Sequence, residues 1–362
     1  MTRSALLVWI VAATAAPAAT VENLGCDQIG PASYRLTFQL SGDGPVMVYA
    51  SSSPDRIDAR KSVALIRKSP AEVSVPAAAG RVYFHLKPDN GPTRVVSIRR
   101  LPIEGAINFR DLGGYRTASG KHTRWGVLYR SDHLVNLTET DYEYLNALGI
   151  KMVCDLRTDF ERKRSPTAWK GNAPEFVIAP VGDGATISAS MASLKRAFDK
   201  GEDPTQYRQT PKAGDPGYAD MLFAYHEQFA QVFHSIANTN APALTHCSGG
   251  ADRTGIYSAL LLETLGVPRE VIVEDYLLTR RNSLDEKTRA ASARNMQRLL
   301  GLDRPPDPEL QRAMASSMNS DRLETMLRTI DAKYGSIDAF LKDGLKISQA
   351  DVDRLRDRLL EP

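Results

Sequence analysis

A ten-residue segment of the sequence carries the groups needed for chemistry on an anionic ester. It reads His246-Cys-Ser-Gly-Gly-Ala-Asp-Arg-Thr-Gly255, and it lies between the apolar stretch Ala243–Thr245 and the apolar run Ile256–Leu262. The pattern predicts a strand, a tight loop and a helix. The backbone N–H groups of such a loop and of the first helical turn can surround an anion, because they have no partners within the helix.

Cys247 is the candidate nucleophile of this segment. A free cysteine has a pKa of about 8.5, and the positive end of a helix stabilises its thiolate form. Arg253 follows six positions later, where its guanidinium can donate two parallel hydrogen bonds to phosphate oxygens. Thr254 is placed to stabilise the thiolate when it leaves in a second step. These groups fit capture of a phosphate ester followed by covalent transfer of the phosphoryl group to sulfur.

The residues around Cys247 and Arg253 are expected to bind the phosphate through their backbone N–H groups. Gly249 and Gly250 permit the backbone angles and the close approach that a ring of such donors requires. The phosphate-binding candidates of the segment are Ser248, Gly249, Gly250, Ala251 and Thr254.

The C-x5-R spacing, with His before it and Thr after it, resembles the signature loop of the cysteine-dependent protein tyrosine phosphatases. Further motifs resemble the bacterial members of the atypical dual-specificity type: Asn108–Tyr115 (NFRDLGGY), Leu128–Ser131 (LYRS), Asp155–Thr158 (DLRT) with Glu161, and Asp275-Tyr276. The resemblance covers about half of the chain, Ile103–Arg281. It implies the phosphatase α/β fold, Cys247 as the nucleophile, and a reaction that uses no metal and no other cofactor.

By the same resemblance, the aspartate directly before the arginine protonates the leaving group, and here that residue is Asp252. Such an acid is needed because the ester oxygen leaves poorly without a proton. Two alternatives stay open. Asp183 follows a predicted strand, where many phosphatases carry a mobile acid loop. Asp155 ends another strand; it is a second acid or substrate-binding candidate, or else a structural partner of Arg110, Arg157 or a backbone N–H group.

Other residues near the loop have supporting roles in this interpretation. Asn108, Arg110 and Asp111 either shape the rim of the site, which makes Arg110 a substrate-binding candidate, or buttress the loop. His246 is expected to hold the loop by a hydrogen bond rather than to act as a base. Cys154 is expected to be a buried structural cysteine, because the alternation of side chains along a strand turns it away when Asp155 faces the site. A regulatory disulfide is the alternative.

One position of the loop bears on the substrate. Phosphoinositide phosphatases of the superfamily carry H-C-K-x-G-K-x-R loops, with lysine where this sequence has Ala251. Since a lysine there adds positive charge for further phosphate groups, its absence favours phosphotyrosine, or mixed phosphorylated residues of proteins. The alternatives are a phosphoinositide or inositol-phosphate phosphatase and a phospho-ligand binding module without turnover. A sulfurtransferase is disfavoured because its Cys-to-Arg spacing is typically shorter.

The composition excludes several classes of protein. The 362 residues include 46 Lys and Arg against 43 Asp and Glu, a net charge of +3 without a long basic run, which argues against a nucleic-acid partner. Three cysteines are too few for a disulfide scaffold, and neither they nor the six histidines show metal-binding spacing. The expected partner is a phosphorylated protein or peptide, with a phosphoinositide as the alternative.

The chain is predicted to divide near residue 100. Residues 20–100 favour a small β-sandwich of the immunoglobulin or fibronectin kind, a structural or targeting module. Its predicted strands are Tyr34–Leu40, Val46–Ala50, Ala71–Val75, Arg81–Leu86 and Arg94–Ile98.

Residues 101–362 are predicted to form the phosphatase domain, a mostly parallel α/β sheet flanked by helices, with further amphipathic helices at its C-terminus. The polar segment 188–217 contains one amphipathic stretch, Met191–Phe198, and is typical of a lid or mobile loop. The predicted strands are Lys151–Cys154, Phe176–Ala179 and Ala243–Thr245, and the predicted helices are Thr138–Leu148, Tyr218–Ile236, Thr254–Leu265 and Arg269–Arg280.

Residues 1–19 are typical of a secretory signal peptide. Arg3 precedes the apolar run Ala5–Ala16, and Ala16-Pro17-Ala18 supplies the A-x-A pattern of a cleavage site. The run is shorter than the roughly 20 residues that a membrane span needs. The sequence therefore predicts an exported protein, periplasmic or secreted after cleavage; a buried N-terminal helix or an uncleaved anchor is the alternative.

Overall fold

The computed structural model describes residues 20–42, 44–57, 61–75, 80–89, 91–207 and 217–361. The predicted signal peptide lies outside the described residues. Contacts divide the chain into two compact units, one of Met1–Ala78 with Val82–Ser97 and the other of Ala79–Arg81 with Ile98–Pro362.

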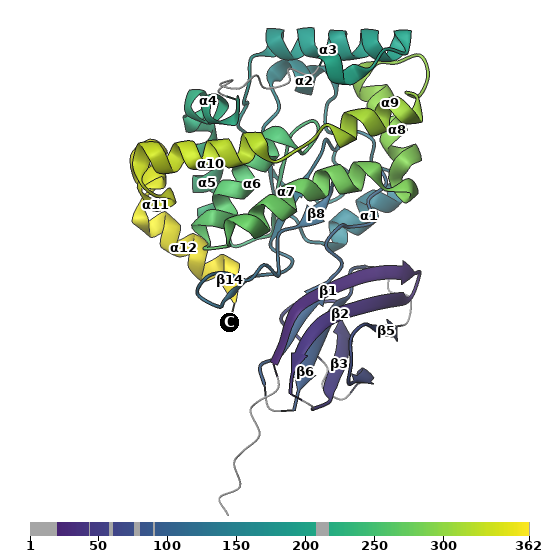
Figure 1. Ribbon diagram of the computed structural model, residues 1–362, viewed down its shortest axis with the longest axis vertical. Helices are drawn as coiled ribbons and strands as arrows, with labels where there is room; N and C mark the ends of the chain where they lie inside the picture. Colours follow the sequence, from purple (N-terminus) through teal and green to yellow (C-terminus); the bar gives the residue numbers. More distant parts are fainter. Residues whose placement is uncertain are drawn as a thin grey trace, which may run out of the picture. The chain divides into compact units, whose positions relative to one another are not determined.

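The smaller unit consists of two antiparallel sheets packed face to face (Figure 1). Tyr34 of one sheet and Phe84 of the other bring their rings to 5.0 Å between centroids in an edge-to-face contact, which fixes the sheets against each other. Burial alternates along the strand that contains Tyr34, Leu36 and Phe38, as expected for a strand with one face in the core. The predicted β-sandwich architecture is therefore confirmed.

All five predicted strands of this unit are present, and two further strands, β1 and β4, were not predicted. The order is β1-β2-β5 in one sheet and β4-β3-β6-β7 in the other. The strands are β1 (Thr20–Gly30), β2 (Ser33–Ser41), β3 (Val46–Ser51), β4 (Ser62–Ile66), β5 (Ala71–Ser74), β6 (Tyr83–Pro88) and β7 (Arg94–Ser97).

The larger unit is built on a five-stranded sheet of order β12-β11-β13-β10-β8. Neighbouring strands are parallel except for β8, which is antiparallel to β10. The mostly parallel sheet is therefore as predicted, and β13 lies at its centre. The strands are β8 (Arg110–Asp111), β10 (Leu128–Ser131), β11 (Met152–Asp155), β12 (Glu175–Ile178) and β13 (Ala243–His246), with a separate antiparallel pair β9 (His122–Thr123) and β14 (Leu360–Glu361).

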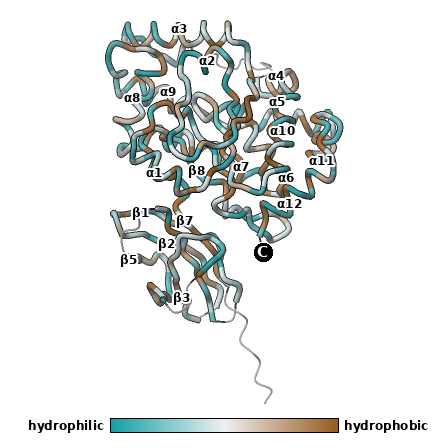
Figure 2. The backbone as a smooth tube through the Cα atoms, turned by 180° about the vertical axis from the view of Figure 1, so that it is seen from behind, coloured by the Kyte–Doolittle hydropathy of each residue, from teal (hydrophilic) through white to brown (hydrophobic). Residues whose placement is uncertain are grey.

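Helices surround this sheet, and both views place α3, α8 and α9 together at one end of the unit (Figures 1 and 2). The predicted stretch Met191–Phe198 is part of the longer helix α3, along which hydrophobic and hydrophilic residues alternate (Figure 2). The helices are α1 (Glu139–Ala147), α2 (Asp159–Arg164), α3 (Gly184–Lys200), α4 (Gly217–Ala224), α5 (His226–Ala237), α6 (Asp252–Thr264), α7 (Arg269–Leu284), α8 (Arg289–Leu300), α9 (Pro308–Ser316), α10 (Asp321–Tyr334), α11 (Ile337–Ala339) and α12 (Gln349–Leu359), with short turns at Pro204–Tyr207, Glu286–Thr288 and Phe340–Gly344.

One predicted helix is wrong in its extent. The stretch Tyr218–Ile236 forms two helices, α4 and α5, because the backbone of Tyr225 (φ −116°, ψ 30°) leaves the helical region. No glycine or proline marks this break in the sequence. Across the described ranges, no helix combines the length and the apolar character that a membrane crossing needs.

Candidate active site

The loop predicted to bind phosphate joins the central strand of the sheet to helix α6. β13 ends at His246 and α6 begins at Asp252, so Cys247–Ala251 forms the connection. β13 lies between β10 and β11, and the last residues of both neighbours pair with His246. Cys247, which is 1% exposed, therefore follows the carboxyl end of the central parallel strand, the edge where α/β proteins bind ligands.

Three consecutive carbonyl groups of this loop accept hydrogen bonds from outside it: those of Ser248, Gly249 and Gly250. The N–H group of His133 donates to the first at 3.1 Å, and the side-chain amide of Asn108 donates to the other two at 3.3 and 3.1 Å. Within the described ranges, none of the N–H groups of residues 248–253 donates to another group of the protein. The loop thus turns its carbonyl groups outward and keeps its N–H groups available to an anion.

Gly250 is required for this arrangement. Its φ of +64° is in the left-handed region, and a Cβ atom there would lie 2.6 Å from both the N atom of Asp132 and the O atom of Ser131. Its carbonyl oxygen also accepts a hydrogen bond from Arg130 at 2.8 Å. At Gly249, by contrast, a Cβ atom would meet nothing within 4 Å. Of the two glycines predicted in the loop, Gly250 is therefore needed for its backbone conformation and for close packing, whereas Gly249 has space for a side chain.

Arg253 is held by a carboxylate whose role was not predicted. Its Nη1 and Nη2 atoms each donate to one oxygen of Glu161, both at 2.7 Å. Glu161 Oε1 also accepts a hydrogen bond from the Ser248 hydroxyl at 2.5 Å. One carboxylate therefore connects the arginine to the first residue after Cys247.

The hydrogen bonds of Arg253 leave one edge of its guanidinium for a ligand. Besides the bond to Glu161, Nη1 donates to the carbonyl oxygens of Leu156 and Val181, each at 3.3 Å. A guanidinium carries five N–H bonds. Within the described residues, Nε–H and the second hydrogen of Nη2 have no acceptor, and these two form a fork that suits two oxygens of a phosphate.

Charge in the site is balanced through the same pair. Burial disfavours the charged form of Glu161, but the hydrogen bonds and positive charge of Arg253 outweigh it and lower the pKa of this carboxyl to about 2. Burial also opposes the charge of Arg253, whose pKa is nevertheless raised by Glu161 and by the nearby Cys247. Both members of the pair are therefore ionised across the physiological pH range, and Arg253 presents a full positive charge beside Cys247.

Asp252, the preferred candidate for the general acid, is the first residue of α6 and adjoins Arg253. Its Oδ1 atom accepts a hydrogen bond from the hydroxyl of Tyr218 in α4 at 2.5 Å. Tyr218 in turn shares a hydrogen bond of 2.7 Å with the hydroxyl of Tyr276 in α7. Oδ2 of Asp252 accepts no hydrogen bond within the described part of the chain, so one carboxyl oxygen is held and the other can serve the substrate.

Asp183 serves as the N-terminal cap of helix α3. Its carboxylate accepts hydrogen bonds from the N–H and the hydroxyl of Thr186 at 2.8 and 2.7 Å, and these bonds lower its pKa. The segment does reach the site, because the carbonyl oxygen of Val181 contacts Arg253. A lowered pKa favours the ionised form, so this arrangement suits Asp183 as a cap better than as an acid.

Asp155 is paired with Arg157, the structural role that the sequence left open as an alternative to an acid or a substrate-binding group. Its Oδ2 atom accepts from Nη2 of Arg157 at 2.7 Å, and Oδ1 accepts from the Arg157 backbone N–H at 2.9 Å. Burial opposes its charge, but His246 and Arg157 outweigh that effect and lower its pKa. The alternative of a structural partner is the one that the geometry supports, because a buried carboxylate bound to arginine is ionised and occupied.

Arg110 belongs to the buttress of the loop and not to its rim. Its side chain is fully buried, with Nε donating to Asp275 Oδ1 at 3.1 Å and Nη1 donating to the side chain of Asn108. Arg130 donates to the other oxygen of Asp275 at 2.7 Å, and Tyr115 completes the set with a bond of 2.8 Å. Of the two roles predicted for Arg110, the geometry supports the buttress, since Arg110 acts on the loop through Asn108.

Asp111 also stabilises backbone structure at a distance from the loop. Its carboxylate accepts hydrogen bonds from the N–H groups of Gly113 and Gly126 at 2.6 and 2.8 Å, and from the guanidinium of Arg81. Of the three residues Asn108, Arg110 and Asp111, only Asn108 contacts the phosphate-binding loop directly.

His246 and Thr254 flank the loop as expected, and both are fully buried. Nδ1 of His246 donates a hydrogen bond to the carbonyl oxygen of Cys247 at 3.2 Å, so the ring holds the loop; burial lowers the pKa of the imidazole. The Thr254 hydroxyl has no hydrogen-bond partner among the described residues; its predicted bond to the thiolate remains a prediction. Cys154 is a free, fully buried thiol whose pKa burial raises to about 12, in keeping with a structural residue.

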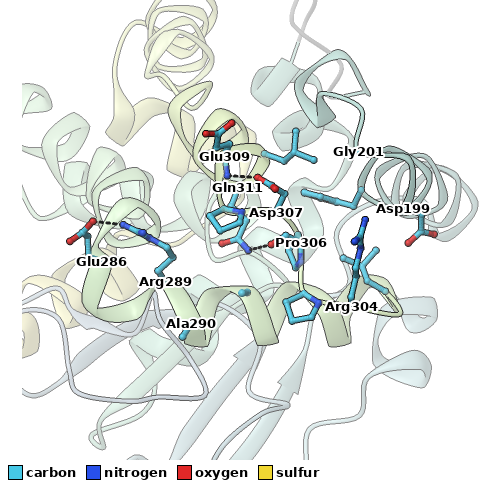
Figure 3. A pocket seen from close by; sticks show the side chains of 16 residues that line it. Asp199, Gly201, Glu286, Arg289, Ala290, Arg304, Pro306, Asp307, Glu309 and Gln311 are labelled. Atoms are coloured by element: carbon cyan, nitrogen blue, oxygen red, sulfur yellow. Dashed lines mark hydrogen bonds and ion pairs between the residues drawn. The ribbon is translucent and has the colours of Figure 1, made fainter.

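A separate pocket lies between the C-terminal end of α3, helix α8 and the segment that leads into α9 (Figure 3). Its volume is about 790 Å³, and Figure 3 shows Arg289 and Arg304 among its charged residues. None of residues 246–254 lines it. Gly184 at the start of α3 follows Val181, which contacts Arg253, and the helix rises about 1.5 Å per residue, so the pocket-lining Phe198 lies roughly 20 Å further along the helix.

Sequence reasoning missed the roles of Glu161 and Tyr218. Glu161 did carry a local signal, because Thr158 and Glu161 form a capping box at the start of α2. That motif predicts a helix start, and a carboxylate there can in addition face outward from the turn. Tyr218 carried no signal, because nothing in the sequence relates it to Asp252.

The fold and the site together define a cysteine-dependent phosphatase: a thiol at the end of the central parallel strand, a ring of backbone donors, and an arginine on the first turn of the following helix. Sequence comparison agrees with this class. The family model described as the tyrosine phosphatase family matches residues 101–361. The chain belongs to this family, which confirms the resemblance inferred from its motifs.

The chain is similar to several bacterial proteins. It is 33% identical to a Cupriavidus necator protein that is provisionally named a tyrosine-protein phosphatase, over 72% of this chain and 88% of that protein. It is 32% identical to the triple specificity protein phosphatase PtpB of Mycobacterium tuberculosis, over 73% of this chain and all of that protein. Among solved structures, P. aeruginosa TpbA aligns with a TM-score of 0.27 and 18% identity over 57% of this chain and 96% of that one.

Proposed function

We propose that this protein hydrolyses phosphotyrosine in proteins through a phosphocysteine intermediate. The observation that carries the proposal is the placement of Cys247 in a loop with outward carbonyl groups, beside an arginine that Glu161 orients. These parts bind a dianion next to a nucleophile. They supply the positioning and the charge stabilisation on which phosphoryl transfer depends.

The reaction follows from the groups present. The Cys247 thiolate attacks phosphorus and forms the S–P bond, while the bond from phosphorus to the ester oxygen breaks and Asp252 gives its proton to that oxygen. Water then attacks the phosphocysteine, Asp252 takes a proton from the water, and the S–P bond breaks to release phosphate and the thiolate. Arg253 and the loop N–H groups hold the phosphate oxygens during both steps.

The proposed substrate is a phosphorylated protein, and Ala251 is the residue that bears on it. Ala251 is buried in the loop and supplies no charge, so Arg253 is the only cation within the segment 247–253 itself. One arginine and a ring of amides match one phosphate group. The relative from Mycobacterium tuberculosis is named for three specificities, so serine and threonine phosphates belong in the test.

The deciding experiment is a substrate panel of phosphotyrosyl, phosphoseryl and phosphothreonyl peptides, inositol hexaphosphate and phosphoinositides, measured with the wild type and with Cys247→Ser. We expect turnover of the phosphotyrosyl peptide by the wild type and none by the variant, with phosphate trapped on Cys247 in a rapid quench. Undiminished turnover by Cys247→Ser contradicts the mechanism. Preference for inositol phosphates or phosphoinositides contradicts the substrate, and binding without turnover by the wild type identifies a binding module.

We also propose that the protein acts outside the cytoplasm. The support is the basic start, the apolar run and the A-x-A pattern of residues 1–19. N-terminal sequencing of the protein recovered from the periplasm or medium of an expressing bacterium tests this, with cleavage expected at about residues 18–20. Recovery of the uncleaved chain from the cytoplasm contradicts it.

A further inference from the structure

Tyr218 places a buried hydroxyl on the side chain of Asp252. The tyrosine is 2% exposed and belongs to α4, 34 residues before Asp252 in the chain. Its hydroxyl donates to Oδ1 of Asp252 at 2.5 Å. Burial raises the pKa of Tyr218 well above its usual value, so the hydroxyl keeps its proton and acts as a donor.

The orientation of this hydroxyl is set by a second tyrosine. Tyr218 has one proton, which is directed to Asp252, so the bond of 2.7 Å between the hydroxyls of Tyr218 and Tyr276 is donated by Tyr276. The two rings meet edge to face, with centroids 6.3 Å apart. Gly255 makes room for the ring of Tyr276, because a Cβ atom there would lie 2.9 Å from it.

We propose that Tyr218 is a positioning residue for the general acid: it holds Oδ1 of Asp252 and so directs Oδ2, with its proton, to the ester oxygen of the substrate. This inference rests on the proposed phosphatase reaction. A carboxyl group whose one oxygen accepts a fixed hydrogen bond carries its proton on the other oxygen. Without that bond, the group can rotate and can be protonated on either atom, and fewer of its states can deliver the proton.

The same bond suits both steps of the reaction. Oδ1 accepts from Tyr218 whether Asp252 is the neutral acid of the first step or the carboxylate that remains after it. Oδ2 loses its proton to the leaving group in the first step and gains one from water in the second. Asp252 thus changes its protonation state without a change in its orientation.

The test compares two substrates that differ in their need for an acid. Phenyl phosphate releases a basic phenolate that must be protonated, whereas 2,4-dinitrophenyl phosphate releases a weakly basic one that leaves without a proton. For Tyr218→Phe we expect kcat/KM to fall about tenfold with phenyl phosphate and to stay within about twofold with the dinitrophenyl ester. Asp252→Asn should show the same selectivity with a larger loss, about a hundredfold.

Two further variants define the role. Tyr257→Phe is the matched control, because it removes a fully buried tyrosine hydroxyl of the same helix α6 that has no hydrogen-bond partner among the described residues; it should leave both substrates unaffected. Combining Tyr218→Phe with Asp252→Asn should cause no loss beyond that of Asp252→Asn, because the tyrosine acts only through the acid.

Any result other than these overturns the proposal. If Tyr218→Phe loses kcat/KM equally with both substrates, or with neither, Tyr218 does not act through the acid. Additive losses in the double variant show the same. If Asp252→Asn loses activity equally with phenyl phosphate and the dinitrophenyl ester, another residue is the general acid. The proposed role of Tyr218 is then wrong as well. The phosphatase reaction itself is judged separately, by the loss of turnover in Cys247→Ser.

Discussion

Glu161 binds the guanidinium of Arg253 end-on, with 2.7 Å from each carboxylate oxygen to a different Nη atom. The same carboxylate accepts hydrogen bonds from the N–H and the hydroxyl of Thr158 at 2.8 and 2.9 Å. One side chain therefore starts helix α2 and aims the arginine of the phosphate-binding loop. Because the arginine is held at one edge, its other edge is already oriented before substrate arrives, and less entropy is lost on binding.

Replacing Glu161 by glutamine should weaken both the enzyme and the fold. The amide keeps the shape but loses the charge and turns a donor toward the N–H groups of Arg253. Breaking a buried ion pair typically costs about 3–5 kcal/mol of stability, and misdirection of the arginine should lower kcat/KM roughly ten- to a hundredfold. Steady-state kinetics and urea unfolding measure the two effects.

The matched control is Glu175→Gln, because Glu175 is exposed on strand β12 and its loss should change stability by less than about 0.5 kcal/mol. If Glu161→Gln retains full activity, the pair with Arg253 does not orient the arginine for catalysis.

The two loop glycines should respond differently to alanine. Gly250→Ala places a Cβ atom 2.6 Å from backbone atoms of Asp132 and Ser131 at a φ of +64°. The left-handed conformation alone costs roughly 1–2 kcal/mol, and the contact adds to it, so unfolding free energy and turnover should both fall. Gly249→Ala meets nothing within 4 Å and should change the unfolding free energy by less than about 0.5 kcal/mol. Equal effects of the two substitutions would contradict the loop geometry.

The sequence predicted functional residues correctly in type and position where those residues and the elements that position them form one continuous segment. Cys247 and Arg253 could be found because the strand, the loop and the helix start that position them are contiguous. Three of the parallel strands, β11, β12 and β13, could be found from their apolar runs, although only β11 and β13 are buried along their whole length. The fourth, β10, was quoted as a motif and not predicted as a strand. β1 (Thr20–Gly30) was missed, because its burial follows no two-residue alternation and pairing with β2 is what makes it a strand.

The side chains that orient the loop could not be predicted from their own neighbourhood. Glu161 lies 92 residues before Arg253 and Tyr218 lies 34 before Asp252, and only the packing of the sheet and helices brings each pair together. For Arg110 the sequence left two roles open, at the rim of the site or in the buttress of the loop. Its motif pointed to the site, but whether an arginine faces a substrate or Asp275 depends on burial, which the motif does not encode.

Asp275 should be among the residues most costly to neutralise. It is 1% exposed and accepts hydrogen bonds from Arg110 and Arg130; burial opposes its charge, but the two arginines lower its pKa well below the usual range. Asp275→Asn leaves two buried guanidinium groups without a countercharge and should lower the unfolding free energy by about 3–5 kcal/mol. Asp338→Asn, which breaks an exposed pair with Arg356, should cost less than about 1 kcal/mol. Similar losses of unfolding free energy for both variants would show that the charge of Asp275 does not stabilise the buried guanidinium groups of Arg110 and Arg130.

Asp132, whose backbone lies against Gly250, should make the free energy of unfolding fall as the pH rises. A carboxylate paired with an arginine has the opposite effect. Burial raises its pKa from 3.8 to about 7, against the effect of the hydrogen bond from the Asn108 N–H. Between these two values the folded protein holds a proton that the unfolded chain has lost. The associated stability is therefore complete below pH 3.8 and is lost as the pH rises through about 7.

The control variant Asp132→Asn keeps an oxygen that accepts the hydrogen bond from the Asn108 N–H, and its amide does not titrate in this range. With tryptophan fluorescence as the probe of urea unfolding, the wild type should lose stability relative to the variant by up to about 1.4 kcal/mol per pH unit over roughly pH 5 to 7. Parallel curves for the two proteins would show that Asp132 is already ionised in the fold at pH 5.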